Sequence, residues 1–453
     1  MNVSSVLQSR LYDVIVIGGG LAGLSSARRL KAAGASVVLL EGRSRIGGRV
    51  HSQRLDTGQT IDLGAQFIGD AQRRISALVD EVGLTRVPPH TAGENVFLMS
   101  PGAEPLFKRG KGLPLSLFGQ LDALWGVWRL NRRLQSYRLA METLDAVAAS
   151  QFLREITFTQ TPADFLSSYI EGEMCTPLDD VSAYEFLDQL ASAGGFGGEG
   201  DSEQWYLAEG TEPLAHHLAD GLGKALVLNS PVTKVEHNDD HVTAYATTGV
   251  YRARHLIVAV PPQLYCSIGL MPLLPENRRK VIADYKHGRV VKTILVFQNP
   301  WWRDQGASGR ALSVGGLFNA VVDSSPADGS VGILVLFSTA ASAHRLDGAG
   351  GEDQRIASAV DWVKTLGGCV IPAPIVARSI DWNADPFSLG GYASYRGMGG
   401  WCLAPDLFDS VDRVHFAGTE TAAEWRSFME GALQSAERAA DMVFAELAAC
   451  DRL

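Results

Sequence analysis

The sequence predicts an α/β protein whose first unit is built on a parallel sheet, and three segments near the N-terminus support this. Tyr12–Ile17 is a run of apolar and β-branched residues typical of a buried strand, Gly18–Gly23 is a glycine-rich turn, and Leu24–Ala33 follows as a helix. Ser36–Leu40 has the composition of a second strand. Continuous apolar strands of this kind are typical of a parallel sheet that helices cover on both faces. We therefore predict a strand–helix–strand unit.

Further elements follow from periodicity and from turn residues. Ile75, Leu78, Val79 and Val82 recur at helical spacing, and Gly83 supplies the end of that helix. From about residue 88 to residue 206 the pattern changes to amphipathic segments with few strand signals, so we predict a helical insertion. Its two clearest helical segments are Leu115–Ser136 and Ala140–Phe152.

Strand signals return after the helical insertion and predict that the first unit is discontinuous. The expected strands are Ala225–Leu228, Val232–Val235, Val242–Thr247, Leu256–Val260 and Arg413–Gly418, and Met429–Leu447 is the expected closing helix. A second insertion of mixed strands and helices separates the last two strands. We predict a first unit made of residues 1–87, 207–262 and 380–453, and a second unit made of residues 88–206 and 263–379.

Length and charge narrow the functional class. A chain of 453 residues with 46% apolar residues is long enough for two or three domain-sized units. Its net charge of −10 disfavours a nucleic-acid partner, because binding to the phosphate backbone needs a basic surface. The most hydrophobic helical stretch, Leu115–Leu130, contains Asp122 and Arg129 and is shorter than a membrane span. We predict a protein that does not associate with membranes.

Cysteine and histidine usage predicts neither a disulfide framework nor a metal site. The five cysteines are far apart, odd in number and never form a CxxC pair, so we expect a reducing compartment, the cytoplasm. His216 and His217 are adjacent and therefore point to different sides of a helix, and the other histidines are scattered along the sequence. The expected metal content is none.

The glycine-rich turn carries the first functional signal. Gly18-Gly19-Gly20-Leu21-Ala22-Gly23 satisfies GxGxxG between a strand and a helix. The first glycine permits the tight turn, the second lets backbone approach a pyrophosphate, and the third lets helix and strand pack closely. Glu41 ends the second strand, where a carboxylate accepts hydrogen bonds from ribose hydroxyls and repels a 2′-phosphate. The sequence predicts a Rossmann-like unit that binds FAD or NAD.

Three further segments decide between these cofactors by resemblance. Residues 41–49, EGRSRIGGR, resemble the second dinucleotide motif of the flavin amine oxidase superfamily. Asp62–Gln66 resembles a flavin-contacting turn of that family, and Arg413–Gly431 is similar to its C-terminal signature. The resemblance implies a discontinuous FAD-binding domain and an α+β substrate-binding domain formed by the two insertions. It implies FAD contacts from Gly18, Gly20, Leu21, Ala22, Gly23, Glu41, Arg43, Gly48, Arg49, Gly64, Ala65, Gln66, Val232, Trp382, Gly418, Thr419, Glu420 and Met429.

The same resemblance implies three catalytic residues and the mode of flavin attachment. Lys292 matches a lysine that holds a water against flavin N5, and a cation there favours the negative charge that develops as O₂ is reduced. Tyr392 and Phe428 match two facing aromatic residues that align an amine in front of the flavin. Gly391 stands where the mitochondrial monoamine oxidases have a cysteine bonded to the flavin. We therefore expect noncovalent FAD.

The expected substrate is a primary or secondary amine without a carboxylate. L-amino acid oxidases of the family place an arginine near the position of Phe67, and many polyamine oxidases place a histidine where this chain has Gly69. An arginine from elsewhere, Arg289, Arg396 or Arg426, remains an alternative partner for a carboxylate. The acidic segment 198–203 is either a solvated loop or the lining of an entrance that attracts cations, which keeps diamines as a second option.

The predicted reaction is oxidative deamination of an amine to an imine, which then hydrolyses to an aldehyde or ketone, while O₂ is reduced to H₂O₂. The alternatives are an L-amino acid, polyamine or diamine oxidase on the same fold, an amine dehydrogenase that uses another acceptor, and a noncatalytic flavin-binding module. Small-molecule amine and O₂ are the expected partners. The sequence leaves the oligomeric state open, with a homodimer as one option.

Overall fold

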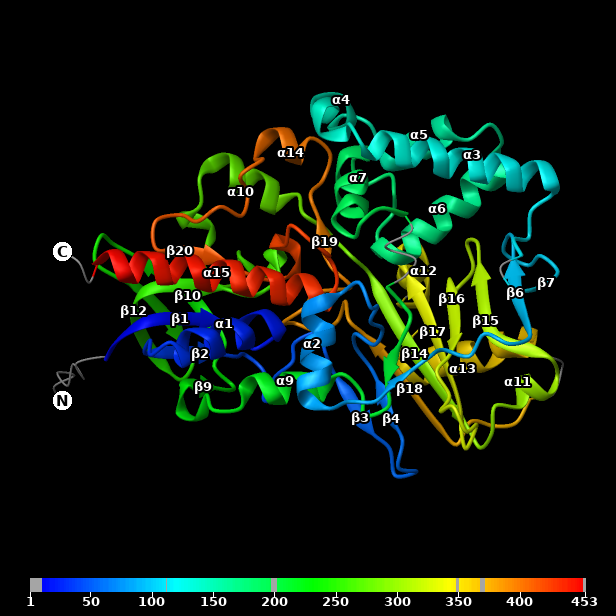
Figure 1. The fold of residues 1–453 in the computed structure, drawn as a ribbon, viewed down its shortest axis with the longest axis horizontal. Helices are drawn as coiled ribbons and strands as arrows, with labels where there is room; N and C mark the ends of the chain where they lie inside the picture. The colour runs from blue at the N-terminus through cyan, green and yellow to red at the C-terminus, as the bar shows by residue number, and fades with distance from the viewer. Residues whose placement is uncertain (1–9, 111, 197–201, 348–349, 367–370, 451–453) are drawn as a thin grey trace.

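The computed structural model describes residues 10–110, 112–196, 202–347, 350–366 and 371–450. Two seven-stranded sheets lie side by side along the long axis of the molecule, each with helices packed on it (Figure 1). The first sheet has the order β10-β11-β12-β1-β2-β9, with β20 also paired to β12, and the second has the order β18-β14-β17-β16-β15-β6-β7. The two-unit architecture confirms the predicted α/β fold class.

The first sheet is the predicted parallel sheet with an antiparallel extension. Its parallel strands are β1 (Leu11–Ile17), β2 (Val37–Leu40), β9 (Leu226–Val227), β12 (Gly249–Val258) and β20 (Val414–Phe416). Strands β10 (Val232–His237) and β11 (Val242–Ala246) extend it antiparallel. The chain therefore leaves this unit twice and returns to it twice, as the sequence predicts.

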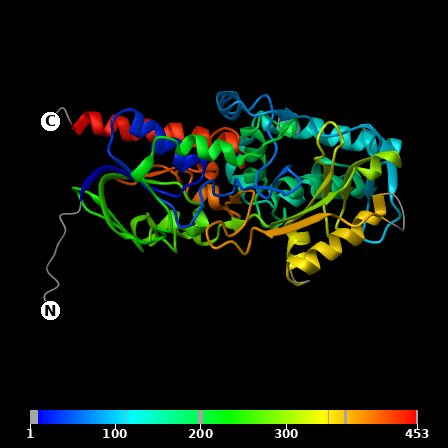
Figure 2. The ribbon, with the colours of Figure 1, turned by 90° about the horizontal axis from the view of Figure 1, so that it is seen from below.

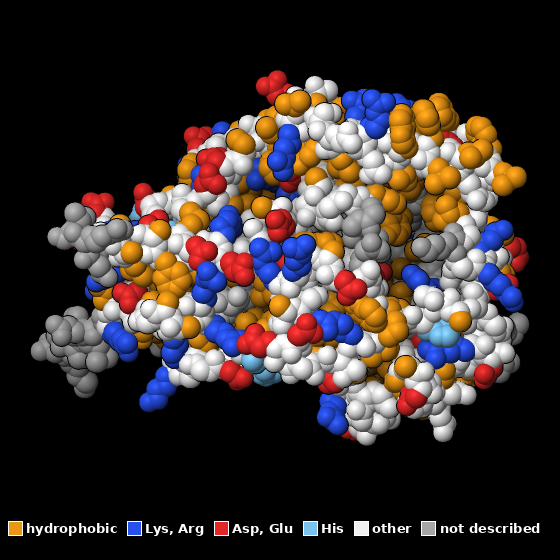
Figure 3. Space-filling view, viewed as in Figure 1, with side chains coloured by type: hydrophobic (Ala, Val, Ile, Leu, Met, Phe, Trp, Pro, Cys, Tyr) orange, Lys and Arg blue, Asp and Glu red, His pale blue; other side chains and the backbone are white. Residues whose placement is uncertain are grey.

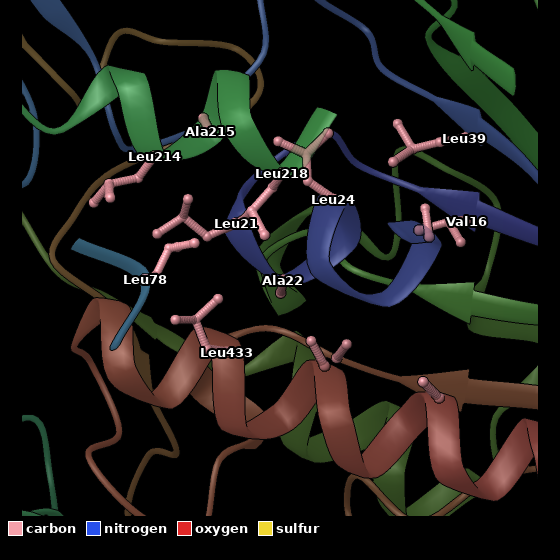
Figure 4. Close-up of a cluster of buried hydrophobic side chains, with 14 of the residues drawn as sticks. Val16, Leu21, Ala22, Leu24, Leu39, Leu78, Leu214, Ala215, Leu218 and Leu433 are labelled. Atoms are coloured by element: carbon pink, nitrogen blue, oxygen red, sulfur yellow. The ribbon is translucent and has the colours of Figure 1, made fainter. Parts of the chain in front are cut away.

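Both faces of the first sheet are buried, which explains the continuous apolar strands. Val14 and Val16 point to the core that contains α1 (Leu21–Ala32), α2 (Arg73–Val82), α9 (Glu212–Ala219) and α15 (Met429–Cys450) (Figure 4). Ile15 and Ile17 point to the opposite core, where Val281 and Ile282 of α10 (Glu276–Ala283) pack. Helix α2 ends where predicted, because Gly83 takes the left-handed conformation that caps it.

The second sheet combines strands from both insertions. Its strands are β6 (Glu94–Leu98), β7 (Leu106–Arg109), β14 (Val290–Phe297), β15 (Ala307–Ser313), β16 (Ala320–Asp323), β17 (Gly332–Thr339) and β18 (Val376–Asp381). Figure 2 shows α13 (Glu352–Val363) on one side of this sheet and the helices of the first insertion on the other. Helix α12 (Ala340–Asp347) also packs beside the sheet.

The first insertion is helical but contains strands that the sequence analysis missed. Its helices are α3 (Leu117–Leu134), α4 (Met141–Asp145), α5 (Ala149–Ile156), α6 (Gln160–Met174) and α7 (Ala183–Ser192). The single helix predicted over 140–152 is wrong, because the chain breaks between α4 and α5. There the amide of Ala149 donates to the Val181 carbonyl, and the amide of Ala183 donates to the Val147 carbonyl. Strand β6 was missed because it pairs with β15, more than 200 residues later, and β7 pairs with β6 at the edge of the sheet.

The remaining elements are short. They are β3 (Ser52–Arg54), β4 (Thr60–Asp62), β5 (Arg86–Val87), β8 (Tyr206–Leu207), β13 (Lys286–His287), β19 (Ser394–Tyr395), α11 (Trp301–Asp304), α14 (Gly400–Leu403), and the 3₁₀ turns Tyr137–Ala140, Gly223–Ala225, Pro262–Leu264, Met271–Leu273, Lys364–Leu366 and Thr419–Thr421. Two of the predicted unit boundaries differ from the observed packing. Residue 380 falls inside β18 of the second sheet, and α10 packs on the first sheet, since its apolar face covers Ile15 and Ile17.

Candidate active site

A large cavity lies where the first sheet meets the second unit. Its empty space, the open mouth included, is about 1510 Å³. Eighteen of the predicted site residues line it: Gly18, Gly20, Leu21, Ala22, Glu41, Arg43, Gly48, Arg49, Gly64, Ala65, Gln66, Lys292, Trp382, Tyr392, Gly418, Thr419, Phe428 and Met429. The cavity therefore has room for a dinucleotide and a second small molecule.

We call the lining contributed by residues 18–22, 41–50 and 418 the glycine wall. It lies at the carboxyl ends of β1 and β2, the edge at which parallel sheets of this topology bind ligands. We call the lining contributed by Lys292, Phe337, Trp382, Tyr392 and Phe428 the aromatic wall. The two walls face one cavity, and Lys292 of β14 and Phe337 of β17 bring the second sheet to it.

The glycine turn has the geometry that the motif predicts. Gly18 has φ +106°, and a Cβ on Gly23 would lie 1.9 Å from the Gly18 carbonyl oxygen, so the turn needs glycine at both positions. Gly20 is the N-cap of α1 and supplies no side-chain cap, and the first turn of α1 contains no acidic residue. The free N–H groups of this helix end therefore fit a phosphate of a dinucleotide.

Glu41 and Arg43 complete the polar part of the glycine wall. Glu41 is buried, and its two carboxylate oxygens accept the Gly19 N–H at 2.5 Å and the Arg43 N–H at 2.8 Å. The remaining lone pairs of this carboxylate can accept ribose hydroxyls. The guanidinium of Arg43 donates to Asp385 and Ser388, while its Nε is buried without a hydrogen-bond partner in the described chain. This donor set fits the ribose and phosphate groups of a dinucleotide.

Three predicted cofactor residues do not line the cavity. Gly23 lies one helical turn from the cavity and packs closely against Gly18, so it shapes the glycine turn from outside the lining. The Glu420 carboxylate is buried and accepts two hydrogen bonds from the Arg49 guanidinium, at 2.6 and 3.1 Å. Glu420 therefore positions Arg49, which does line the cavity. Val232 is buried in the core on the far side of the first sheet.

Lys292 is a buried cation at the aromatic wall. Alternate side chains of β14 point to opposite faces of the sheet, and Lys292 lies on the same face as the buried Ile294 and Val296. Its ammonium donates to the Gly64 carbonyl oxygen and to Gln66 Oε1, both at 2.9 Å. An ammonium has three N–H bonds, so one remains for a water or a ligand in the cavity. Burial lowers the pKa of Lys292 to about 8, and the nearby Asp62 carboxylate opposes that shift.

Aromatic rings surround the space in front of Lys292. The Tyr392 ring meets Phe337 edge to face at 6.4 Å between centroids, and Phe428 meets Trp425 in the same way at 5.3 Å. The Lys292 ammonium lies 5.4 Å from the centroid of the Phe337 ring. Burial raises the pKa of the Tyr392 phenol well above its ordinary value, so this ring is neutral at physiological pH. The chamber therefore presents uncharged ring faces.

Two carboxylates at this chamber were not predicted as site residues. Glu173, at the end of α6, and Glu203 both line the cavity, and both lie close enough to Tyr392 to raise the pKa of its phenol. Burial raises the pKa of Glu203, and the positive charge of Arg310 opposes that shift. Glu203 belongs to the acidic segment singled out in the sequence, whose residues 198–201 lie outside the described chain. The sequence did not distinguish Glu173 as a site residue, because it is one acid among several on an amphipathic helix.

The arginines proposed as partners for a substrate carboxylate are absent from the described lining of the cavity. Arg426 pairs with Glu185 and Asp188, and Arg396 lies 3.7 Å from the Trp401 ring centroid, while Arg289 is exposed. Their positions disfavour recognition of a carboxylate.

Two of the scattered histidines meet in the fold, away from the cavity. His255 and His415 come together at adjacent strands and face the Glu446 carboxylate at 3.1 and 3.5 Å. Among the described residues this is the group whose ligand atoms come close enough for a metal ion. Ser410 also hydrogen-bonds to His415 at 2.8 Å, while His255 Nε2 is buried without a hydrogen-bond partner among the described residues. In the described part of the chain, none of the helices is long and apolar enough to cross a membrane.

Comparison with known proteins agrees with this geometry. Residues 21–444 match the family described as flavin containing amine oxidoreductase. The putative flavin-containing monoamine oxidase AofH of Mycobacterium tuberculosis is 30% identical over 96% of this chain and 97% of its own, and an amine oxidase [flavin-containing] of Oncorhynchus mykiss is 28% identical over 96% and 86%. A structure of putrescine oxidase bound to putrescine superposes with a TM-score of 0.89 at 26% identity, over 96% of this chain and 99% of that one.

The family match covers almost the whole chain, and it agrees with a glycine wall suited to a dinucleotide and an aromatic wall with a buried lysine. The flavin-dependent oxidoreductase expected from the sequence is thereby confirmed at the level of the family. This chain belongs to the flavin-containing amine oxidoreductases.

Proposed function

We propose that this protein uses noncovalent FAD to oxidise a primary or secondary amine to an imine and reduces O₂ to H₂O₂. The observation that carries the proposal is the buried Lys292 ammonium, with a free N–H bond, beside the aromatic rings of the chamber. Bound FAD would accept a hydride from the carbon next to the amine nitrogen and pass two electrons to O₂. The imine then hydrolyses in water to an aldehyde or ketone and ammonia or a smaller amine.

The chain's own residues have separate roles in this proposal. Tyr392 and Phe428 hold a neutral amine between ring faces and so orient its carbon–hydrogen bond, which lowers the entropic part of the barrier. Lys292, oriented by Gly64 and Gln66, places a positive charge where negative charge develops on oxygen. An amine that enters deprotonated needs no protein base, so the pH–rate profile should follow the pKa of the amine.

Noncovalent binding is supported by the side chains around the chamber. Gly391 lines the cavity and has no nucleophile. The Cys175 thiol is buried against Val290 and Trp382, and burial raises its pKa well above the ordinary value. A protonated thiol is a poor nucleophile. We expect acid precipitation of the yellow protein to release all flavin into the supernatant.

Anaerobic mixing tests the proposed reaction directly. The FAD-loaded protein is mixed with a panel of monoamines, amino acids and diamines, and the visible flavin absorbance is followed. We expect bleaching by monoamines, no bleaching by amino acids, and recovery of colour with release of one H₂O₂ per flavin when air is admitted. Bleaching with slow recovery in air would instead identify a dehydrogenase. A flavin that no amine bleaches would remove the catalytic proposal.

A second candidate substrate class is a diamine, and Glu173 and Glu203 favour it. Both carboxylates line the cavity near Tyr392, so a second ammonium at the far end of a substrate would lie in a region of negative potential. The match to a putrescine oxidase fold agrees with this arrangement. Arg310 acts on Glu203 from nearby and weakens the negative potential of that carboxylate.

The ratio of two specificity constants separates the candidates. For a diamine oxidase, Glu173→Gln should lower kcat/KM for a diamine about tenfold or more and leave kcat/KM for a monoamine of equal chain length unchanged. Glu171→Gln, on the same helix but outside the described lining, is the matched control. An equal change for both substrates would remove the diamine candidate and leave the monoamine proposal intact.

A further inference from the structure

Over residues 117–128, helix α3 buries its small residues and exposes its large apolar residues, whereas Leu130 further along the helix is buried. Gly119, Ala123 and Gly126 are buried, at spacings of three and four. A Cβ on Gly126 would lie 3.0 Å from Thr157 Cγ2, so the helix sits close against the turn that follows α5. The exposed large apolar residues are Leu117, Phe118, Leu121, Leu124, Trp125 and Trp128, which are 43–82% exposed.

Amphipathic helices of globular proteins normally bury their large apolar side chains. Here close packing has selected glycine and alanine for the inner face, so the outer face carries the apolar area. Contiguous exposed apolar patches are uncommon on monomeric proteins and mark interaction sites. The exposed residues recur at positions 117, 121, 124 or 125, and 128, which places them in one stripe along the helix.

The aromatic part of this stripe is held in place by neighbouring structure. Trp125 stacks with Trp128 at 4.7 Å and with Phe158 at 6.2 Å between centroids. The buried Asp122 carboxylate accepts the backbone N–H groups of Phe158 and Thr159, each at 2.8 Å, and so fixes the turn that presents Phe158. Phe158 is 68% exposed. The patch is therefore a preformed surface.

Positive charge follows directly along the helix. Residues 117–139 contain four arginines, at 129, 132, 133 and 138, and one acid, the buried Asp122, although the whole chain carries a net charge of −10. The guanidinium of Arg132 lies 5.1 Å from the Trp128 ring centroid, so cation and ring share one surface. Figure 3 shows the basic cluster beside the apolar area at the upper edge, where Figure 1 places α3.

We propose that this α3 face, defined as the exposed apolar residues above with Phe158, Arg132 and Arg133, binds the surface of an anionic phospholipid bilayer. Leucine and aromatic side chains enter the boundary between headgroups and acyl chains, and arginines pair with the headgroup phosphates. Because the described helices include none that could span a bilayer, the contact is with one leaflet. This proposal departs from the membrane-free protein that the sequence analysis expected.

A second copy of the chain suits this face less well. In a symmetric dimer the same patch meets itself, and the α3 of the second copy offers no accessible carboxylate for the arginines. The acid of this helix, Asp122, is buried and already bonded to Phe158 and Thr159, so it cannot neutralise them. An anionic bilayer supplies both the apolar phase and the opposite charge.

Vesicle flotation of the FAD-loaded full chain tests the proposal. The probes are vesicles of phosphatidylcholine alone and of phosphatidylcholine with phosphatidylglycerol. We expect the protein to float with the anionic vesicles, to stay in solution with the neutral ones, and to be released by high salt because screening weakens the arginine contacts. Sedimentation without either kind of vesicle controls for aggregation.

Two double variants separate the apolar and the charged contributions. Arg132→Gln with Arg133→Gln should lower partitioning into anionic vesicles roughly tenfold or more, and Leu121→Gln with Leu124→Gln should reduce it at least as much. Arg73→Gln with Arg279→Gln removes two exposed arginines on α2 and α10 and should change nothing. Far-ultraviolet circular dichroism and unchanged turnover of a soluble amine show that each variant is folded.

Three results would overturn the proposal. They are no flotation with anionic vesicles, equal flotation of the wild type and both α3 variants, and a dimer in light scattering that the Leu121→Gln and Leu124→Gln pair dissociates. The last result would identify a second copy as the occupant of the α3 face.

Discussion

The two walls of the cavity are built by different means. The glycine wall is mostly backbone from the three segments 18–22, 41–50 and 418, and its shape depends on residues that lack a side chain, such as Gly18 and Gly23. The aromatic wall is mostly side chains, and Lys292, Tyr392 and Phe428 come from three separate segments. A backbone wall tolerates no added atom, whereas a side-chain wall can be altered one group at a time. Mutations at the first should therefore act on cofactor binding, and mutations at the second on rate and specificity.

The largest expected effect tests whether the aromatic wall controls rate alone. Lys292→Met removes the buried cation and keeps an apolar chain of similar length, so reoxidation of the reduced flavin by O₂ should slow about 100-fold or more. Stopped-flow absorbance measures that rate. The flavin content should remain that of the wild type. Lys234→Met, at an exposed position of β10, serves as control, and unchanged oxygen kinetics in Lys292→Met would remove Lys292 from the mechanism.

The next largest effect tests whether the glycine wall controls the binding of FAD. Gly23→Ala places a Cβ 1.9 Å from the Gly18 carbonyl oxygen, and overpacking of this kind costs about 1–3 kcal/mol. FAD affinity should fall roughly 5- to 150-fold, as measured by titration of the apoprotein. Gly172→Ala is the control, because nothing lies within 4 Å of its added Cβ. A normal FAD affinity in Gly23→Ala would mean that the turn adjusts and that the backbone wall is not rigid.

The third prediction tests whether the positive charge of Lys292 is needed at the aromatic wall. Because the pKa of Lys292 is lowered to about 8, its side chain is protonated below that pH and neutral above it. Reoxidation should therefore slow about tenfold between pH 7 and pH 9. The Lys292→Met variant should show a flat profile over this range. A wild-type profile as flat as that of the variant would contradict a role for the ammonium proton.

The smallest effect tests how far the aromatic wall tolerates a single added group. Phe428→Tyr keeps the ring face and adds a hydroxyl, so kcat/KM for a monoamine should change about threefold or less. Phe428→Ala removes the ring and should lower kcat/KM about tenfold through loss of orientation and contact area. Steady-state kinetics on one amine compares both. Equal values for the two variants would show that the ring itself has no role.

The first unit could be predicted almost entirely from the sequence because its signals are local. The apolar run of β1, the glycine turn and the end of α2 at Gly83 are each encoded within a few residues. The same holds for the glycine turn of residues 18–23, since this one segment supplies both the conformation and the backbone N–H groups of the helix end. The match to a known family motif extended this prediction to residues 41–49 and 413–431.

The second unit and the acidic part of the site depended on long-range contacts. Strand β6 has a partner, β15, far along the chain, and the break between α4 and α5 arises from pairing with residues 181–183. Glu173 and Glu203 are ordinary acids in the sequence, and only packing brings both to the chamber that contains Tyr392. The role of Glu420 as partner of Arg49 likewise needed the spatial arrangement.

The sequence by itself determined the parallel sheet and the dinucleotide turn, because strand alternation and glycine conformations follow from local covalent geometry. Its resemblance to a known family supplied the candidate lysine and aromatic residues. Only the tertiary structure decided which acids face the chamber and which side of α3 faces solvent. Those outcomes depend on which surfaces meet across the fold, and close packing around Gly126 rather than hydrophobicity chose the inner face of that helix.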